Sequence, residues 1–449
     1  MSTPASFLAA NPPLLARVKP VTQPQEQTVP TTAFPHNQAV RWRFLFIHFF
    51  TLLLVCISIA QWTVPLWLLT SATSAPLTLM QPLYVLIPTF LFVLNLAVLR
   101  SLRRIPHLPS LLRLPIRLYF AYGFTAVFCF VFLLLCGGIW LALSLACQMI
   151  GVAITGMETS IARVQTSLSE SLRWASNLGV ATITTAFVYG YTRGQQQLQI
   201  TRLTLSLPDW PEAWQGLKLL HLSDLHIGSN LSPSELQNYL ARANVLAPDL
   251  VFLTGDLLDA NPAYIPEFFP LLNQLTARYG VFACLGNHDV YAGSQAVAEG
   301  LARYTHITLL RDQIIQLTIS GLPLYIVGLE DRGKDWARGL DTLPHLSALV
   351  SSIPSAAPRI LLSHRPDLFP QAASEGFLLT LSGHTHGGQI ALPGWQGRFN
   401  LARLITRFPR GLYSQRGRFL YVNRGLGVTG QRVRIFTPRE IALLTCESQ

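Results

Sequence analysis

The chain has 449 residues, of which 50% are hydrophobic and only 12% are charged. Because disordered chains combine low hydrophobicity with high charge, this composition excludes a disordered protein. Soluble proteins carry about 25% charged residues, so a wholly soluble protein is not expected either. A formal net charge of +11 accompanies this low content of charged residues.

The positive charge is concentrated in the N-terminal part of the chain. Residues 1–199 contain three acidic and twelve basic residues, whereas residues 200–449 are nearly balanced. Strong positive charge often indicates a nucleic-acid-binding protein. Here the arginines flank long apolar runs, which favours a membrane protein with lipids as its neighbours. We therefore expect no nucleic-acid partner.

Four apolar runs follow a polar N-terminal tail. The tail, residues 1–43, is rich in Pro, Thr and Gln without a periodic pattern, which is typical of flexible segments. A membrane-spanning helix needs about 20 apolar residues. We expect a transmembrane region over residues 44–199 with about four helices, at residues 44–69, 77–99, 118–150 and 178–191. The mixed segment 152–177 is either an amphipathic interfacial helix or a plain connection.

The basic residues predict how the chain is oriented in the membrane. Bases precede the first run and five arginines separate the second from the third, and basic loops stay in the cytoplasm. If the short fourth run also spans, the C-terminal half returns to the cytoplasm. If that run lies on the surface, the C-terminal half faces outside. We expect the first arrangement, a multi-pass protein of the inner (plasma) membrane with a cytoplasmic C-terminal domain.

From residue 217 onward, short apolar runs alternate with helix-like segments. Strands are expected at residues 217–222, 250–253, 281–285, 324–327, 360–362 and 378–381, and helices at 232–247 and 265–278. Strands that alternate with helices are typical of α/β domains, so residues 200–449 are expected to form one.

Polar side chains follow five of these strands. The clusters are Asp224-x-His226, Gly255-Asp256-x-x-Asp259, Gly286-Asn287-His288-Asp289, Ser363-His364 and Gly383-His384-x-His386. Because each follows an apolar strand, we expect them to meet at one edge of the sheet. Carboxylates suit hard divalent ions and imidazoles suit Zn, Fe and Mn, so the set indicates a site for two metal ions. Such a pair can bind the nucleophile and the phosphoryl oxygens of an in-line displacement.

This series of motifs resembles the calcineurin-like metallophosphoesterase superfamily over residues 200–449. Three stretches are similar to its membrane-anchored bacterial subgroup: His386-Gly387-Gly388-Gln389-Ile390, Arg424-Gly425-Leu426-Gly427 and Pro438-Arg439-Glu440-Ile441. The layout is similar to that of transmembrane proteins with a metallophosphoesterase domain. The resemblance implies an N-terminal α-helical transmembrane bundle followed by an α/β metallophosphoesterase domain, which is a two-sheet β-sandwich flanked by helices.

The resemblance also implies roles for individual residues. Asp224, His226 and His386 would hold the first ion. Asn287, His364 and His384 would hold the second ion, and the Asp256 carboxylate would contact both. His288 would donate a proton or hydrogen bond to the leaving oxygen. Asp259 would support the site, and Asp289 would either orient His288 or act as a structural cap. The implied reaction is attack by a metal-bound hydroxide, with Mn²⁺ as the favoured ion and Fe or Zn as alternatives.

The expected substrate depends on residues 398–439, which contain ten arginines, several apolar residues and no acid. This segment is either a solvated face or a basic, partly apolar surface beside an anionic bilayer. The second reading suits a phosphorylated small molecule or lipid, and a membrane-associated branch of the superfamily hydrolyses the pyrophosphate of UDP-diacylglucosamine. The alternatives are a membrane-bound protein phosphatase and a non-enzymatic metal-binding scaffold. The complete ligand set counts against the scaffold.

Overall fold

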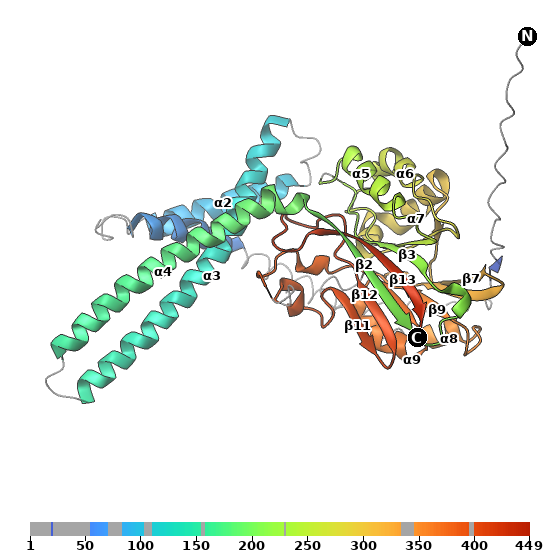
Figure 1. Cartoon of the computed structure of the whole chain (residues 1–449). Coiled ribbons are helices and arrows are strands. Elements are labelled where there is room, and N and C mark those ends of the chain that lie inside the picture. The colour runs from blue at the N-terminus through green and yellow to red at the C-terminus, as the bar shows by residue number, and fades with distance from the viewer. Residues whose placement is uncertain are drawn as a thin grey trace, which may run out of the picture. The chain divides into compact units, whose positions relative to one another are not determined.

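The computed structural model describes residues 19–20, 54–70, 83–102, 110–153, 158–228, 230–333, 345–394 and 399–449. The chain divides into two compact units (Figure 1). One unit comprises Gln27–Tyr191, and the other comprises Thr192–Gln449 together with Met1–Glu26.

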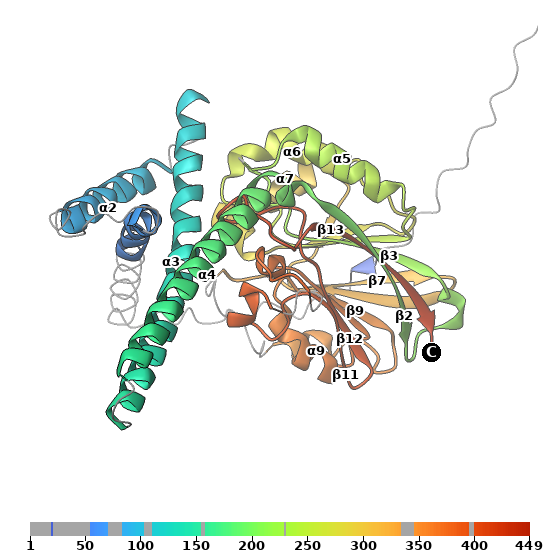
Figure 2. The ribbon, with the colours of Figure 1, turned by 60° about the vertical axis from the view of Figure 1, so that its left-hand side comes forward.

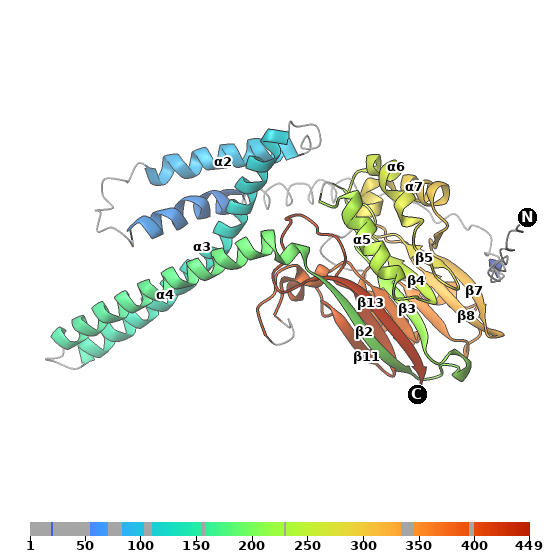
Figure 3. The same cartoon turned by 45° about the horizontal axis from the view of Figure 1, so that its top comes forward.

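Long helices make up the described part of the first unit. They are a helix over Leu54–Thr70 and the helices α2 Leu83–Leu102, α3 Ser110–Ala153 and α4 Glu158–Thr192. Helices α3 and α4 lie side by side in Figures 1 and 3, and the Gln165 amide of α4 donates to the Ser144 carbonyl of α3 at 3.3 Å. The Asn95 amide lies 2.9 Å from both Ser58 Oγ and Gln61 Oε1, which joins α2 to the helix before it.

The four predicted membrane-spanning runs agree with the helices of the structure to different degrees. Among the described residues, one helical stretch is long and apolar enough to cross a membrane, Leu114–Ile150, and it contains the predicted run 118–150. Residues 44–53 and 77–82 of the first two runs lie outside the described residues. The fourth run, 178–191, is the end of α4, which begins at Glu158. Residues 158–177 are helical and continue directly into the fourth run, which argues against a plain connection. An interfacial position for this part of α4 stays a prediction. A four-helix transmembrane region stays a prediction.

Two mixed β-sheets form the described part of the second unit. The first sheet has the order β2-β13-β3-β4-β5-β6, and the second has the order β1-β7-β8-β9-β10-β12-β11. The strands of the first are β2 Leu198–Leu207, β3 Leu217–Leu222, β4 Leu250–Thr254, β5 Val281–Cys284, β6 Thr308–Leu309 and β13 Arg439–Ser448. Those of the second are β1 Lys19–Pro20, β7 Gln313–Ile319, β8 Leu322–Gly328, β9 Arg359–Leu362, β10 Leu379–Ser382, β11 Gly411–Gln415 and β12 Arg418–Val422.

The two sheets pack face to face and helices cover their outer faces. The helices are α5 Pro233–Asn244, α6 Ile265–Leu272, α7 Asn287–Tyr304, α8 Leu346–Val350 and α9 Phe369–Ser374. Figure 2 shows α5 and α6 on one side of the strands and α9 on the other. Along β3, Leu219 belongs to the apolar core between the sheets, whereas Leu220 and Leu222 belong to the core under α5–α7. Both faces of β3 are thus buried, which explains why four of its six residues are leucines.

The structure confirms the α/β domain with two sheets and corrects one step of the argument for it. Parallel strands β3, β4 and β5 belong to the first sheet, whereas β9 and β10 belong to the second. The five polar clusters therefore do not lie along the edge of one sheet, as the strand pattern alone suggested. They follow strand ends from two facing sheets.

Candidate metal centre

The predicted site residues lie where the chain leaves β3, β4 and β5 of the first sheet and β9 and β10 of the second, with Asn287 and His288 in the first turn of α7. All eight are brought together: Asp224, His226, Asp256, Asn287, His288, His364, His384 and His386. Six of them are at most 3% exposed, and His288 and His384 are partly buried. Burial of so many polar side chains is costly unless each has a partner or a bound ion.

The backbone of this site is strained. Asp224, His226, Asp256, His384 and His386 all have positive φ angles, between 45° and 70°. This left-handed conformation costs roughly 1–3 kcal/mol for a residue with a side chain, and it clusters at functional sites. Five such residues around one centre indicate that the fold holds these side chains in place at the expense of stability.

Two glycines let ligand carboxylates approach the backbone closely. A Cβ atom on Gly286 would lie 2.2 Å from Asp256 Oδ1, and one on Gly383 would lie 2.2 Å from Asp224 Oδ2. Glycine at these two positions therefore makes room for the carboxylates of the site.

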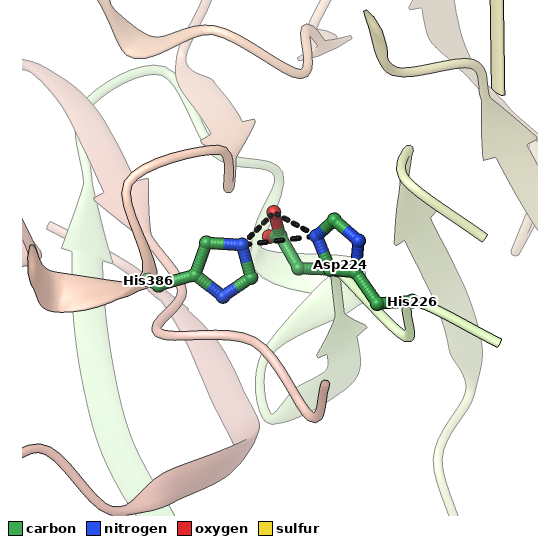
Figure 4. Close-up of side chains that lie close together, drawn as sticks. All are labelled: Asp224, His226 and His386. Atoms are coloured by element: carbon green, nitrogen blue, oxygen red, sulfur yellow. Dashed lines mark hydrogen bonds and ion pairs between the residues drawn. The ribbon is translucent and has the colours of Figure 1, made fainter. Parts of the chain in front are cut away.

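The first group of donors is Asp224, His226 and His386 (Figure 4). The two imidazoles face each other with their Nε2 atoms 3.0 Å apart. His386 Nε2 also lies 3.4 Å from Asp224 Oδ1, and His226 Nε2 lies 3.9 Å from the same oxygen. On the other side of its ring, His226 Nδ1 lies 3.4 Å from Asp259 Oδ1, so that carboxylate orients the ring with Nε2 toward the centre.

The second group is Asp256, His364 and His384. His364 Nδ1 lies 2.7 Å from the Thr254 carbonyl oxygen, which can only accept, so Nδ1 carries the proton and the lone pair of Nε2 is left for an ion. This Nε2 lies 3.2 Å from Asp256 Oδ2 and 3.2 Å from His384 Nδ1.

Asp256 lies between the two groups. Its Oδ2 is 3.4 Å from His226 Nε2 of the first group and 3.2 Å from His364 Nε2 of the second. Its Oδ1 accepts a hydrogen bond from the His288 backbone N–H at 2.8 Å. Asn287 is 2% exposed, and its Oδ1 is buried without a hydrogen-bond partner. A buried acceptor of this kind needs a donor or a cation.

The electrostatics of the site favour bound cations. Burial opposes the charged form of His364, but the carboxylates of Asp256 and Asp224 outweigh it and raise its pKa to about 10. Burial and the neighbouring His364 imidazole hold the pKa of His384 well below its usual value. Burial raises the pKa of Asp224. Divalent ions would satisfy the carboxylates and the imidazole lone pairs together.

The donor set fits two such ions. Donors about 2.0–2.2 Å from one ion, at angles near 90–110°, are themselves about 3.0–3.6 Å apart. The nitrogen and oxygen atoms of each group are mostly separated by such distances. The mixture of carboxylate, amide and imidazole suits Mn, Fe or Zn.

His288 is held by Asp259, a residue for which the sequence suggested only an unspecified supporting role. His288 Nδ1 lies 2.5 Å from the Asp259 carbonyl oxygen and 3.4 Å from its Oδ1. Asp289 instead accepts from the backbone N–H groups of Leu258 and Gly286, both at 2.9 Å. Of the two roles left open for Asp289, the structure therefore favours the structural cap.

Sequence reasoning missed the buried arginine that faces the site. Arg434 is 0% exposed, and its Nη2 lies 3.5 Å from His386 Nδ1 and 2.6 Å from the Gly427 carbonyl oxygen. The Gly427 N–H in turn donates to the Asp224 carbonyl at 2.6 Å. Only its place among ten arginines marked Arg434 in the sequence, and that signal does not single it out.

Comparison with known proteins agrees with this geometry. The family model described as calcineurin-like phosphoesterase matches residues 217–388, a range that contains all eight predicted site residues. A metallophosphoesterase of Bacillus subtilis, YkuE, is 30% identical over 276 residues, which cover 60% of this chain and 94% of that protein.

Two further relatives have more informative names. The transmembrane protein with metallophosphoesterase domain of Danio rerio is 29% identical over 270 residues, covering 57% of this chain and 58% of that protein. The UDP-2,3-diacylglucosamine pyrophosphatase of Chlamydia trachomatis serovar D is 29% identical over 308 residues, covering 56% of this chain and 89% of that protein. The chain thus spans less than two thirds of the length of some curated relatives that it matches.

Proposed function

Because the chain belongs to the calcineurin-like phosphoesterase family, we propose that it is a membrane-anchored phosphoesterase that uses two divalent ions to hydrolyse a phosphoester or pyrophosphate bond. The observation that carries this proposal is the position of Asp256. One carboxylate lies within 3.4 Å of an imidazole nitrogen from each donor group. A shared carboxylate is what a pair of closely spaced cations requires.

The assignment of ligands follows the two groups of donors. Asp224, His226 and His386 would hold one ion, His364, His384 and Asn287 would hold the other, and Asp256 would contact both. When bound, such ions act as Lewis acids on phosphoryl oxygens and lower the pKa of water. Mn²⁺ is the ion we favour, with Fe and Zn as the alternatives.

His288 is the proposed proton donor to the leaving oxygen. Its Nδ1 is engaged by Asp259, which leaves Nε2 as the nitrogen available to a substrate. The side chain is 23% exposed, in contrast to the buried imidazoles of His226 and His364, so solvent and substrate can reach it. A positioned acid of this kind contributes roughly 10²–10⁴-fold to turnover.

The proposed substrate is a phosphorylated lipid or a nucleotide-lipid pyrophosphate. Two observations support this choice: a relative named as a UDP-2,3-diacylglucosamine pyrophosphatase and a helical stretch, Leu114–Ile150, that is apolar enough to span a bilayer. The proposed location is the inner (plasma) membrane, with several crossings and the phosphoesterase domain in the cytoplasm.

A substrate panel tests the proposal. We would assay the purified full-length protein in detergent with Mn²⁺, and with EDTA as the control, on bis(p-nitrophenyl) phosphate, a phosphopeptide and UDP-2,3-diacylglucosamine. The expected result is Mn²⁺-dependent hydrolysis that is fastest on the lipid pyrophosphate. Preference for the phosphopeptide would replace the lipid substrate with a protein substrate. No hydrolysis of any of the three with any of the candidate ions would contradict an enzymatic role.

A further inference from the structure

Exposed apolar side chains of the phosphoesterase unit gather in one part of it. Among its described residues, ten large hydrophobic side chains are exposed, and seven of these lie between residues 392 and 436. Leu404 is the most exposed of the seven, at 83%. Scattered exposed hydrophobics need no explanation, but a contiguous group marks an interaction surface.

Backbone hydrogen bonds hold these side chains on neighbouring segments. The Leu392 N–H donates to the Phe399 carbonyl at 2.9 Å, and the Leu401 N–H donates to the Ile390 carbonyl at 3.3 Å. The Ala391 N–H donates to the Ile435 carbonyl at 2.9 Å. We call the surface formed by these segments the docking face; its apolar side chains are Leu392, Phe399, Leu401, Leu404, Ile405 and Phe436.

The docking face is anchored to the loop that carries two of the proposed metal ligands. A Cβ atom on Gly388 would lie 2.8 Å from the Ala402 nitrogen and 2.9 Å from the Leu401 nitrogen, so the two segments are in close contact. The Thr385 hydroxyl donates to the Pro409 carbonyl at 2.6 Å. Because these contacts hold the backbone of the docking face in place, its exposed side chains cannot turn inward and become buried.

Positive charge is interleaved with the apolar side chains. Arg403 and Arg407 are exposed, and residues 376–439 contain no acidic residue. The two arginines line a cavity of about 350 Å³ together with Ile405, Thr406 and Asp367. Asp367 accepts a hydrogen bond from the Thr406 hydroxyl at 2.7 Å, and it is the one acid that lines this cavity. The cavity therefore presents two guanidinium groups against one carboxylate, which complements an anionic phosphate.

We infer that the docking face rests on the anionic surface of a bilayer, with Leu404 and Ile405 inserted among the acyl chains and Arg403 and Arg407 at the lipid phosphates. Exposed leucines beside arginines match the acyl-chain layer and the phosphate layer of a membrane interface. Each basic residue near an anionic surface contributes about 1 kcal/mol to the free energy of membrane binding. The inference rests on the membrane anchoring of the proposed function but not on hydrolysis. It would place the loop of His384 and His386 directly behind the lipid-facing surface.

Spin labels at two equally exposed positions test this inference. Leu404 and Val245 are both apolar and both 83% exposed, and Val245 lies outside the docking face, at the end of α5. The full-length chain carrying Leu404→Cys or Val245→Cys would be labelled and placed in nanodiscs containing anionic phospholipid. The unsubstituted chain, labelled in parallel, gives the background from the native cysteines. Collision rates with oxygen and with a water-soluble nickel chelate report lipid and water contact, respectively.

The expected result is a several-fold higher ratio of oxygen to nickel collisions at position 404 than at position 245. Adding Arg403→Glu and Arg407→Glu, or using neutral lipid, should lower the ratio at 404 and leave that at 245 unchanged. If the nanodiscs retain the chain but positions 404 and 245 give equal, water-like ratios of oxygen to nickel collisions, the inferred contact of the docking face with lipid is wrong. The membrane anchoring would still stand. Low collision rates with both reagents at 404 would indicate a protein contact and would also overturn the contact with lipid. A chain that the nanodiscs do not retain would overturn the anchoring as well.

Discussion

His288 Nδ1 lies 2.5 Å from the backbone carbonyl oxygen of Asp259 and 3.4 Å from its carboxylate. One residue therefore fixes both the tautomer and the orientation of the imidazole, since the carbonyl can only accept. Asp259 also faces His226 Nδ1 at 3.4 Å. It thus links the proposed acid to a proposed metal ligand, although it belongs to neither proposed set of ion ligands.

Replacing His288 should separate chemistry from metal binding. We expect His288→Ala to keep both ions and lose about 10²–10⁴-fold in turnover, the usual contribution of one general acid. Metal analysis and steady-state kinetics on the same preparation measure the two effects. His306→Ala removes an exposed imidazole beyond the end of α7 and should change neither. Loss of metal in His288→Ala would mean that His288 is a ligand.

Asp259 should control the alkaline limit of the reaction. Burial disfavours the charged form of His288, but Asp259 and Asp256 outweigh it and raise the pKa of His288 to about 9. His288 is then protonated at neutral pH, and a reaction that needs its proton slows as the pH rises through this value. Removing the Asp259 charge lowers that pKa. Asp259→Asn should therefore shift the alkaline limb of the pH–rate profile to lower pH, and an unshifted limb would contradict the assignment.

Asp256 should be essential for both ions. An amide carries no charge to share between two cations, so we expect Asp256→Asn to lose hydrolysis and to lower the metal content of the purified protein. Asp209→Asn, at a side chain that is 68% exposed, is the matched control and should keep both. An Asp256→Asn protein with two ions and full turnover would rule out the shared position.

The structure explains why the stretches around Arg424 and Glu440 take part in the resemblance to the membrane-anchored subgroup. Glu440 is buried and accepts from Arg424 through the backbone N–H at 3.0 Å, Nε at 3.1 Å and Nη2 at 2.8 Å. Two of the three stretches that resemble the membrane-anchored subgroup are thus bonded to each other. The Gly425 that follows Arg424 would place a Cβ atom 2.6 Å from the Asp224 Cβ. The ion pair therefore fixes a loop that lies directly against a proposed ligand.

Breaking this buried pair should be costly. Removing one member of a buried ion pair costs about 3–5 kcal/mol because the other charge is left unpaired. We expect Glu440→Gln to lower the melting temperature, whereas Glu299→Gln on the exposed face of α7 should not. Burial opposes the Glu440 charge, but Arg424 outweighs it and lowers the pKa of Glu440. The stabilisation is therefore present above the ordinary carboxyl pKa and lost as the pH falls through the lowered one, so the variant should be less sensitive to acid.

The strands around the site could be predicted because burial leaves them no polar face. Strand β3 begins and ends where the apolar run 217–222 does, and β4 and β9 differ from their predicted bounds by one residue. Strands β2 and β11 were missed because they alternate between exposed and covered positions. Strand β13 was missed because it begins with Arg439 and Glu440, whose charges are buried only through partners distant in sequence.

The place of the site could be predicted, but not its geometry. Polar clusters after five apolar strands marked the region, and the family resemblance singled out the eight residues that the structure brings together. Their roles stay predictions. Whether Asp259 or Asp289 faces His288 depends on where β4 and β5 place their loops, since both acids are close to the motif in sequence. The positive φ angles at Asp224 and His386 are likewise not encoded by any local pattern in the sequence.

The last prediction concerns the side of the membrane on which the phosphoesterase domain lies. Residues 174–192 form the uncharged end of α4 and cover about 28 Å at 1.5 Å per residue, close to the roughly 30 Å of a bilayer core. Arg173 and Arg193 flank this stretch and can extend to the two interfaces. Two of its threonines are satisfied within the helix: the hydroxyl groups of Thr182 and Thr185 each donate to the carbonyl four residues earlier at 2.8 Å. Paired hydroxyls lower the cost of placing this stretch in lipid.

We therefore expect the end of α4 to cross the membrane and the C-terminus to lie in the cytoplasm, because the basic residues before residue 44 and between 100 and 117 fix the earlier crossings. C-terminal fusions to green fluorescent protein and to alkaline phosphatase measure this directly. The fluorescent fusion should be bright and the phosphatase fusion inactive. A chain in which Arg193 and Arg173 are both replaced by glutamine, with the other bases intact, should keep this orientation if the earlier loops set it. An active phosphatase fusion with a dark fluorescent one would place the domain outside and move the search for substrates to the outer surface.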